Sequence, residues 1–300
     1  MFSPDEPPSS PVSEIFYQLE ENFRLNPQLC NFVEIIYSKK FQPIQSRREI
    51  ANLGQCIVQY LERSPPSMTT HFMRGMAEVM QSANSNIMGP PSSTTRTATT
   101  LFLMKLLPRL DHFSPSELHL RLESQVVAQL VRDLASAFTE ETIFVVTPHR
   151  VQRSLVTKEL TSFGLQLRSR EDSKSSRIWV DTTERMQGIL ENVFADLLGS
   201  EADIVVCLFS HTHLPSLRRD LDFIYNRPRL NVAISRAKTI SIVISSEGVL
   251  NPPIEALVDR GNLDGFTYLK AYEDRAWSYN YALELRPSLG SQKYFQPGPF

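Results

Sequence analysis

The chain has 300 residues, of which 41% are hydrophobic and 21% are charged, and its formal net charge is −2. This composition is that of a globular protein of one or two domains. The near-neutral balance excludes a chain that is basic overall, so any contact with nucleic acid must come from a local patch.

The cysteines and the first residues bear on the compartment. Cys30, Cys56 and Cys207 are widely spaced and odd in number, which argues against a disulfide framework or a zinc site and fits a reducing compartment. Residues 1–13 form a Pro/Ser-rich lead-in without the apolar core of a signal peptide, and no run is long enough to span a membrane. We expect an intracellular protein, in the nucleus or the cytoplasm, without a membrane partner.

Residues 14–98 have mainly helical patterns. Asn26-Pro27 is a helix-start signal. Apolar residues recur at helical spacing in 50–61 and in the methionine-rich stretch 68–88, where such a stripe is more often core than binding surface. We interpret this region as a helical N-terminal connector.

From residue 99 onward, apolar runs alternate with helical stretches. The predicted strands are 101–107, 143–147, 178–181, 204–209 and 240–245, and the clearest helices are 122–134 and 151–163. This alternation indicates parallel βαβ units, and therefore an α/β fold with a doubly wound parallel sheet. We assign this domain to 99–260 and treat 261–300 as a C-terminal extension with a loose tail.

Ligands bind such sheets outside the carboxyl ends of the strands. Three polar segments fall there, namely 147–150, 181–188 and 210–213. They contain three histidines, but no supporting cluster of cysteines or carboxylates accompanies these, so the sequence predicts no metal site. No local signature supports a catalytic Ser/His/Asp or Cys/His set.

The stretch 229–238 contains two arginines, Arg229 and Arg236, whose spacing would place them on one face of a helix. Small apolar residues between them would let that helix pack on the sheet. A planar guanidinium matches phosphate oxygens and keeps its charge. By spacing alone, two solvated arginines on a surface helix are the commoner outcome.

The string Leu-Asn-Val-Ala-Ile-Ser-Arg-Ala-Lys at 230–238 resembles motif VI of superfamily 1 helicases, in the group of the nonsense-mediated-decay helicase. Three further segments resemble family motifs, in family order. Residues 19–27 resemble the segment after motif III, 145–152 resemble motif IV, and 180–188 resemble motif V. The resemblance implies the RecA-like fold of the P-loop NTPase superfamily, and within it the C-terminal domain of the helicase.

In that family, one group of the motif residues contacts the nucleotide. The resemblance implies that Arg236 reaches the γ-phosphate of ATP and that Arg24 contacts the phosphates. Phe23 would lie against the adenine, where Phe keeps the stacking face of the more usual Tyr. Gln187 and Gly188 would let backbone approach the nucleotide.

One further nucleotide contact, a family glutamate that comes after the glycine of motif V, has two candidates. Residues 189–200 interrupt the motif, so Glu201 matches by the residues after it and Glu191 by its nearness to the glycine. Glu123 also matches a family glutamate, although a solvated glutamate in a first helical turn is as common.

The remaining matches imply contacts to a single nucleic-acid strand. Thr147, His149 and Arg150 come from motif IV, and Thr182 and Thr183 come from motif V. Hydroxyls and basic side chains at strand ends hold phosphates without reading base sequence.

The sequence contains no Gly-x-x-x-x-Gly-Lys-Ser/Thr. ATP hydrolysis in this family needs that loop for the phosphates and an acidic pair for Mg²⁺, both of which belong to a first RecA-like domain. We therefore expect ATP with Mg²⁺ as the cofactor, bound at a site that this partner domain completes. We expect no ATPase activity from this chain alone.

The sequence supports three hypotheses. The first is the C-terminal half of an ATP-dependent DNA or RNA helicase. The second is a truncated or degenerate helicase-like module that binds nucleic acid or protein without ATPase activity. The third is an unrelated α/β binding fold with chance motif matches.

Overall fold

The computed structural model describes residues 21–22, 29–33, 42–43, 47–85, 98–109, 114–168, 176–183 and 201–284. Phe23, Arg24, Gln187 and Gly188, which were predicted to contact nucleotide, lie outside these residues, as does the 189–200 interruption with Glu191. A short parallel pair, β1 (Glu21–Asn22) with β2 (Gln42–Pro43), stands apart from the main sheet.

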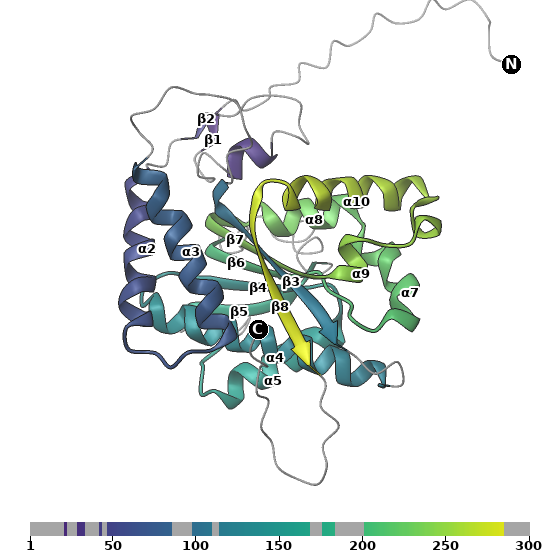
Figure 1. Ribbon diagram of the computed structural model, residues 1–300, viewed down its shortest axis with the longest axis horizontal. Helices are drawn as coiled ribbons and strands as arrows, with labels where there is room; N and C mark the ends of the chain where they lie inside the picture. Colours follow the sequence, from purple (N-terminus) through teal and green to yellow (C-terminus); the bar gives the residue numbers. More distant parts are fainter. Residues whose placement is uncertain are drawn as a thin grey trace, which may run out of the picture.

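The main sheet has six strands, all parallel, in the order β5-β4-β6-β7-β3-β8 (Figure 1). The strands are β3 (Ala98–Arg109), β4 (Ile143–Thr147), β5 (Ile178–Thr182), β6 (Ala202–Leu208), β7 (Ala237–Ser246) and β8 (Ala276–Glu284). With helices on both faces, it confirms the predicted doubly wound α/β fold.

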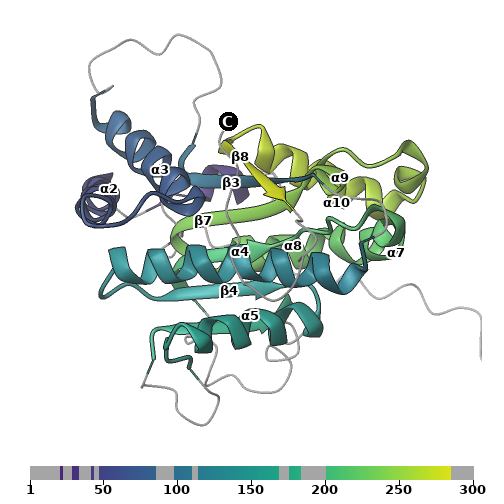
Figure 2. The ribbon, with the colours of Figure 1, turned by 60° about the horizontal axis from the view of Figure 1, so that its bottom comes forward.

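Each face of the sheet carries its own layer of helices and its own apolar core. One layer comprises α2 (Arg47–Leu61), α3 (Met68–Ser85), α4 (Ser116–Ala137) and α5 (Arg150–Ser162). The other comprises α7 (Leu214–Ile224), α8 (Arg227–Ile234), α9 (Glu247–Leu250), the 3₁₀ turn η3 (Ile254–Leu257) and α10 (Arg260–Glu273). Figure 2 shows α4 and α5 running side by side on their face.

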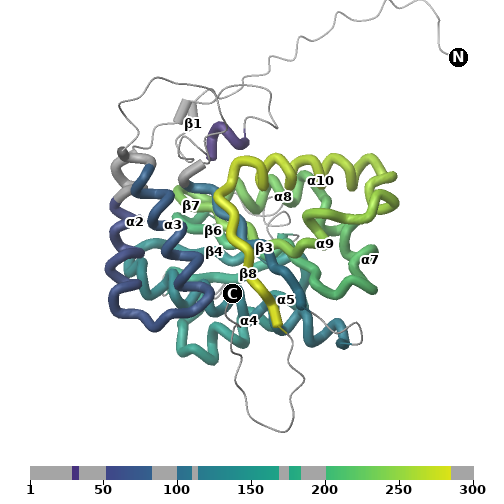
Figure 3. The backbone as a smooth tube through the Cα atoms, in the orientation of Figure 1, coloured from purple at the N-terminus to yellow at the C-terminus, as the bar shows by residue number. Residues whose placement is uncertain are grey.

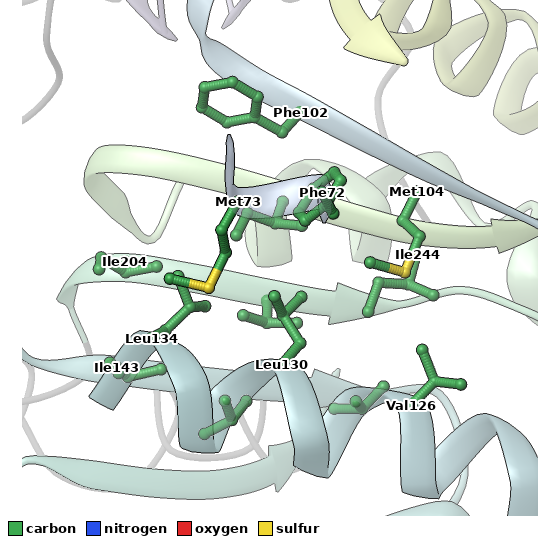
Figure 4. Close-up of a cluster of buried hydrophobic side chains, with 14 of the residues drawn as sticks. Phe72, Met73, Phe102, Met104, Val126, Leu130, Leu134, Ile143, Ile204 and Ile244 are labelled. Carbon is green, nitrogen blue, oxygen red and sulfur yellow. The ribbon is translucent and has the colours of Figure 1, made fainter. Parts of the chain in front are cut away.

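The period-2 geometry of the strands divides their side chains between these two cores. Along β3, Phe102 and Met104 enter the core under α3 and α4, whereas Leu101 and Leu103 enter the core under the opposite layer. Figure 4 shows Met73 of α3 in the first core, near Leu134 of α4. Because Met73, Met76 and Met80 are all fully buried, the methionine stripe is confirmed as core.

A buried carboxylate fixes the α2–α3 hairpin to α4. Asp133 is 2% exposed and accepts hydrogen bonds from the Tyr60 hydroxyl at 3.0 Å and the Thr69 hydroxyl at 2.5 Å. The Gln129 amide lies 2.9 Å and 3.0 Å from its two oxygens. The connector is therefore docked through polar contacts as well as through its apolar face.

Replacing Asp133 by alanine should lower the free energy of unfolding by about 2–4 kcal/mol, because two hydroxyls and an amide lose their acceptor in a buried place. Urea unfolding followed by circular dichroism measures this loss. Tyr60→Phe, which removes one of these bonds, should cost only about 1 kcal/mol. Equal stability of Asp133→Ala and the parent chain would show that the carboxylate does not anchor the hairpin.

The stretch after residue 260 continues the same sheet. Helix α10 leads into β8, which pairs with β3 from Phe102 to Arg109 in parallel register. In Figure 3 the yellow tube of β8 lies beside the blue tube of β3, although the two segments are far apart in sequence. The sequence patterns did not predict β8.

Candidate functional site

Two segments predicted to contact a nucleic-acid strand lie at the carboxyl edge of the sheet, which is where the parallel β-strands end. Thr147 closes β4 and Thr182 closes β5, and the two are paired in register. Both are buried, as is Thr183. Among the described residues, the Thr182 and Thr183 hydroxyls have no hydrogen-bond partner. Buried polar groups are normally paired, so these hydroxyls are candidates for contact with a ligand.

The turn after β4 adds basic side chains to this carboxyl edge. His149 caps α5 in an extended conformation, and Arg150, the first residue of that helix, is exposed. The His149 ring lies 4.7 Å from the Phe223 ring, and its Nε2 lies 3.8 Å from Asp220 Oδ1. The five residues predicted to contact a nucleic-acid strand are thus gathered at the carboxyl edge of the sheet.

Glu123 of α4 anchors the loop that comes after β6. Its Oε1 accepts the Thr212 backbone N–H at 2.6 Å, and its Oε2 accepts the Gln152 amide at 3.0 Å. Complete burial raises the pKa of this carboxyl against the effect of those hydrogen bonds. Of the two alternatives for Glu123, the solvated first-turn glutamate does not hold, because this residue is fully buried and lies further into the helix. Glu123 instead fixes the position of 210–213.

A chain of polar side chains orders the same loop. His211 Nδ1 lies 2.6 Å from Asp220 Oδ2, and His211 Nε2 lies 2.7 Å from the Ser216 hydroxyl. Ser216 and Asp220 are four residues apart on α7, which places them on one face of that helix. Sequence reasoning missed this His–Ser–Asp arrangement because no local signature announces it.

The charges around His211 favour its protonated form. Burial lowers its pKa, but the hydrogen bond and charge of Asp220, together with the charge of Glu123, outweigh burial and leave the pKa raised.

Within the described part of the chain, no group of three His, Cys, Asp or Glu residues is arranged to hold a metal ion. No described helix is long and apolar enough to cross a membrane.

The motif VI stretch is a helix and then a strand. Asn226 caps α8, its side chain accepting the Arg229 N–H at 3.1 Å, and Pro228 occupies the first turn. The helix ends at Ile234, and β7 begins at Ala237. The prediction that Arg229 and Arg236 share one helix face is therefore wrong. The β-branched run after Arg236 extends β7 back to Ala237, which ends the helix early.

Arg236 lies at the amino edge of the sheet, opposite the threonines. Its carbonyl accepts the Ala202 N–H at 3.1 Å, and Ala202 pairs with Ala237 as the first residues of β6 and β7. Because such sheets bind ligands outside the carboxyl ends of their strands, we expect a nucleotide-contacting Arg236 to lie there. This expectation is wrong, because a connection between parallel strands must return to the amino edge. Glu201 precedes Ala202, so Arg236 and Glu201 are neighbours at this edge.

The two arginines of this stretch have different surroundings. Arg236 is 7% exposed and has contacts within the chain. The guanidinium of Arg229 instead lies over the Phe223 ring, 4.0 Å from its centroid. Arg236 is therefore nearly enclosed by the chain.

The all-parallel sheet with helices on both faces is an α/β module of RecA-like architecture. The family model described as an AAA domain matches residues 9–248, and the chain belongs to this family. It is thus a helicase-like AAA domain of the P-loop NTPase class.

Among solved structures, the chain is similar to the Hef helicase domain of Pyrococcus furiosus, with 12% sequence identity and a TM-score of 0.26. The match covers 77% of this chain and 55% of that one, so the chain spans about half the length of this relative. No curated protein matches the sequence.

Proposed function

We propose that the chain is the second RecA-like domain of an ATP-dependent superfamily 1 helicase that moves along a single strand of DNA or RNA. The observation that carries this proposal is the sorting of the motif residues. Those assigned to the strand gather at the carboxyl edge, and Arg236 with Glu201 gathers at the amino edge. The sheet therefore separates Arg236 and Glu201 from the residues assigned to the single nucleic-acid strand.

At the carboxyl edge, the proposed ligand is the sugar-phosphate backbone. Thr182 and Thr183 offer unpaired hydroxyls, and Arg150 offers an exposed positive charge. Thr147 already donates weakly to backbone carbonyls at 3.4 and 3.5 Å, so we assign it a supporting position. Such groups hold phosphates and leave the bases unread.

At the amino edge, the proposed ligand is ATP with Mg²⁺. Arg236 and Arg24 would stabilise the charge on the transferring phosphoryl group, as arginine fingers do. Glu201 lies on the same side, whereas Phe23, Gln187 and Gly188, which the resemblance also assigns to the nucleotide, lie outside the described residues. The phosphate loop and the Mg²⁺ ligands would come from a first RecA-like domain.

Two observations favour a second candidate, a helicase-like module that binds nucleic acid or protein without ATPase activity. Arg236 is 7% exposed, and residues 189–200 interrupt motif V. A segment with a phosphate-loop motif, encoded directly upstream in the same frame or in a missed exon, would favour the helicase instead.

Binding of single-stranded nucleic acid by the 300-residue chain tests the role proposed for the carboxyl edge. Replacing both Thr182 and Thr183 by valine should weaken binding of a short labelled single strand by about a hundredfold, because each of the two lost hydrogen bonds to a charged phosphate is worth roughly 1.5 kcal/mol. Fluorescence anisotropy measures the affinity. Thr161→Val on the exposed side of α5 is the matched control. Equal affinities for all three proteins would remove these threonines from the site.

A further inference from the structure

The carboxyl edge contains histidines that have no role in the proposed function. His119 of α4 and His213 of the loop after β6 have ring centroids 5.0 Å apart, and the His211 ring lies 6.3 Å from that of His213. His149 stands at the same edge, through its contact with Asp220. Four of the histidines come from three separate elements to meet here.

The rings are held in fixed positions. The Ser216 hydroxyl lies 2.7 Å from His211 Nε2 and 2.6 Å from His213 Nδ1. His119 Nδ1 lies 3.0 Å from the Thr212 hydroxyl. His119 and His211 are buried, whereas His213 is half-buried. His213 is therefore the ring of this trio that a ligand at the edge reaches first.

The carboxylates beside the trio already have partners. Asp220 contacts His211 at 2.6 Å and His149 at 3.8 Å, and Arg219 lies near enough to lower its pKa further, although burial opposes this. Glu123 faces the loop from α4 and is occupied by Thr212 and Gln152. The oxygens of both carboxylates are thus engaged by neighbouring groups and do not contact the His213 ring in the contacts described.

A further buried hydroxyl stands unused at the start of this loop. Ser210 is 1% exposed, and its Oγ has no hydrogen-bond partner within the described residues. Like the hydroxyls of Thr182 and Thr183, it can donate to a phosphate oxygen. The loop after β6 therefore offers the same donor chemistry as the ends of β4 and β5.

We propose that the loop 210–213 is an additional phosphate-binding site for the single strand, and that His213 takes up a proton when the phosphate binds. This inference rests on the proposed strand-binding function and names a contact and a regulation that the helicase motifs do not supply. Ser210 would donate its hydroxyl, and His213 would become an imidazolium paired with the phosphate.

The direction of the pH effect follows from comparing the pKa of His213 in the empty site with its pKa beside a bound phosphate. Burial and the neighbouring His211 lower the pKa of His213, and burial together with His213 and His211 lowers the pKa of His119 to about 4. A bound phosphate favours the charged imidazole and raises the pKa. The gain in affinity is therefore complete below the lowered pKa of the empty site and is lost as pH rises through the higher pKa of the complex.

The experiment measures the affinity of the 300-residue chain for a labelled single strand between about pH 8 and about pH 6 at constant ionic strength. We expect binding to tighten as pH falls, by up to about tenfold per pH unit for each proton taken up. Titration calorimetry in two buffers of different ionisation enthalpy should show net proton uptake on binding.

Substitutions at His213 separate a proton-linked contact from general acid effects. His213→Gln should lose most of the pH dependence and bind more weakly than the parent near pH 6. His213→Arg should bind tightly even near pH 8, with little pH dependence, because its charge is permanent. His71→Gln, on the exposed side of α3, should behave as the parent does.

The outcomes distinguish this inference from the proposed function. Strand binding with equal affinity at every pH, or with the same pH dependence in His213→Gln, would overturn the proton-linked site and leave the proposed function standing. Absence of strand binding at every pH would overturn the proposed function, and the inference with it.

Discussion

Replacing Arg236 by alanine should lower strand-stimulated ATPase activity by about a thousandfold or more once a first RecA-like domain completes the enzyme. The guanidinium is the group proposed to meet charge as it develops on the transferring phosphoryl. Arg236→Lys should fail as well, because an ammonium does not reproduce the planar fork. The first domain would come from upstream sequence or from a close relative, and phosphate release measures the rate.

Arg229→Ala is the matched control, since Arg229 lies over the Phe223 ring. It should keep most of the activity. The chain without a first domain should show no hydrolysis above background with any of these residues in place. Robust Mg²⁺-dependent hydrolysis by the chain alone would contradict the division of labour between the two domains.

The 7% exposure of Arg236 makes the interruption of motif V part of the same experiment. Deleting 189–200 rejoins Gly188 to Glu201. Higher activity after this deletion would identify the interruption as an obstacle, and lower activity would identify it as part of the site. If neither form hydrolyses ATP beside a competent first domain, the non-catalytic module is the better description.

Gly265→Ala should destabilise the fold by about 3 kcal/mol, by overpacking. A methyl group at this position of α10 would lie 1.6 Å from the Tyr225 carbonyl oxygen and 2.2 Å from its carbonyl carbon. Tyr225 is fully buried, and its hydroxyl donates to the Val249 carbonyl at 2.5 Å. Neither backbone can yield without moving α10 away from the junction of α7 and α8.

Urea unfolding measures this loss. Gly54→Ala is the control, because the added methyl would meet only side-chain carbons of Met80 and Gln81 and a carbonyl oxygen at 3.3–3.6 Å. Alanine is also the better helix former by about 1 kcal/mol, so Gly54→Ala should change stability little. A Gly265→Ala protein as stable as the parent would show that α10 does not pack this closely.

The sheet was predictable because its inner strands are buried on both faces. Segments such as 143–147 and 204–209 are nearly continuous runs of apolar or β-branched residues, which is the pattern of a central parallel strand. By contrast, β8 alternates aromatic and polar side chains from Trp277 to Tyr281, as an edge strand does. That weaker pattern, placed after the predicted domain, gave no signal.

The site was predictable where it depends on strand ends alone. All parallel strands end at one edge, so Thr147 and Thr182 had to meet. Arg236 was misplaced because it follows α8 and directly precedes β7, so it lies where β7 begins and not where the strands end. The contact of Glu123 with Thr212, and that of His211 with Asp220, join separate elements. Such pairings appear only once the chain is folded.

Strand β8 has one more consequence, for the behaviour of shortened chains. It covers the outer side of β3, whose residues 101–107 are almost wholly apolar. A chain cut after residue 260 would keep β3 and lose its neighbour, leaving a row of unpaired N–H and C=O groups along a hydrophobic strand. Exposed edges of that kind recruit a second copy and seed aggregation. The last strand therefore protects the sheet against self-association.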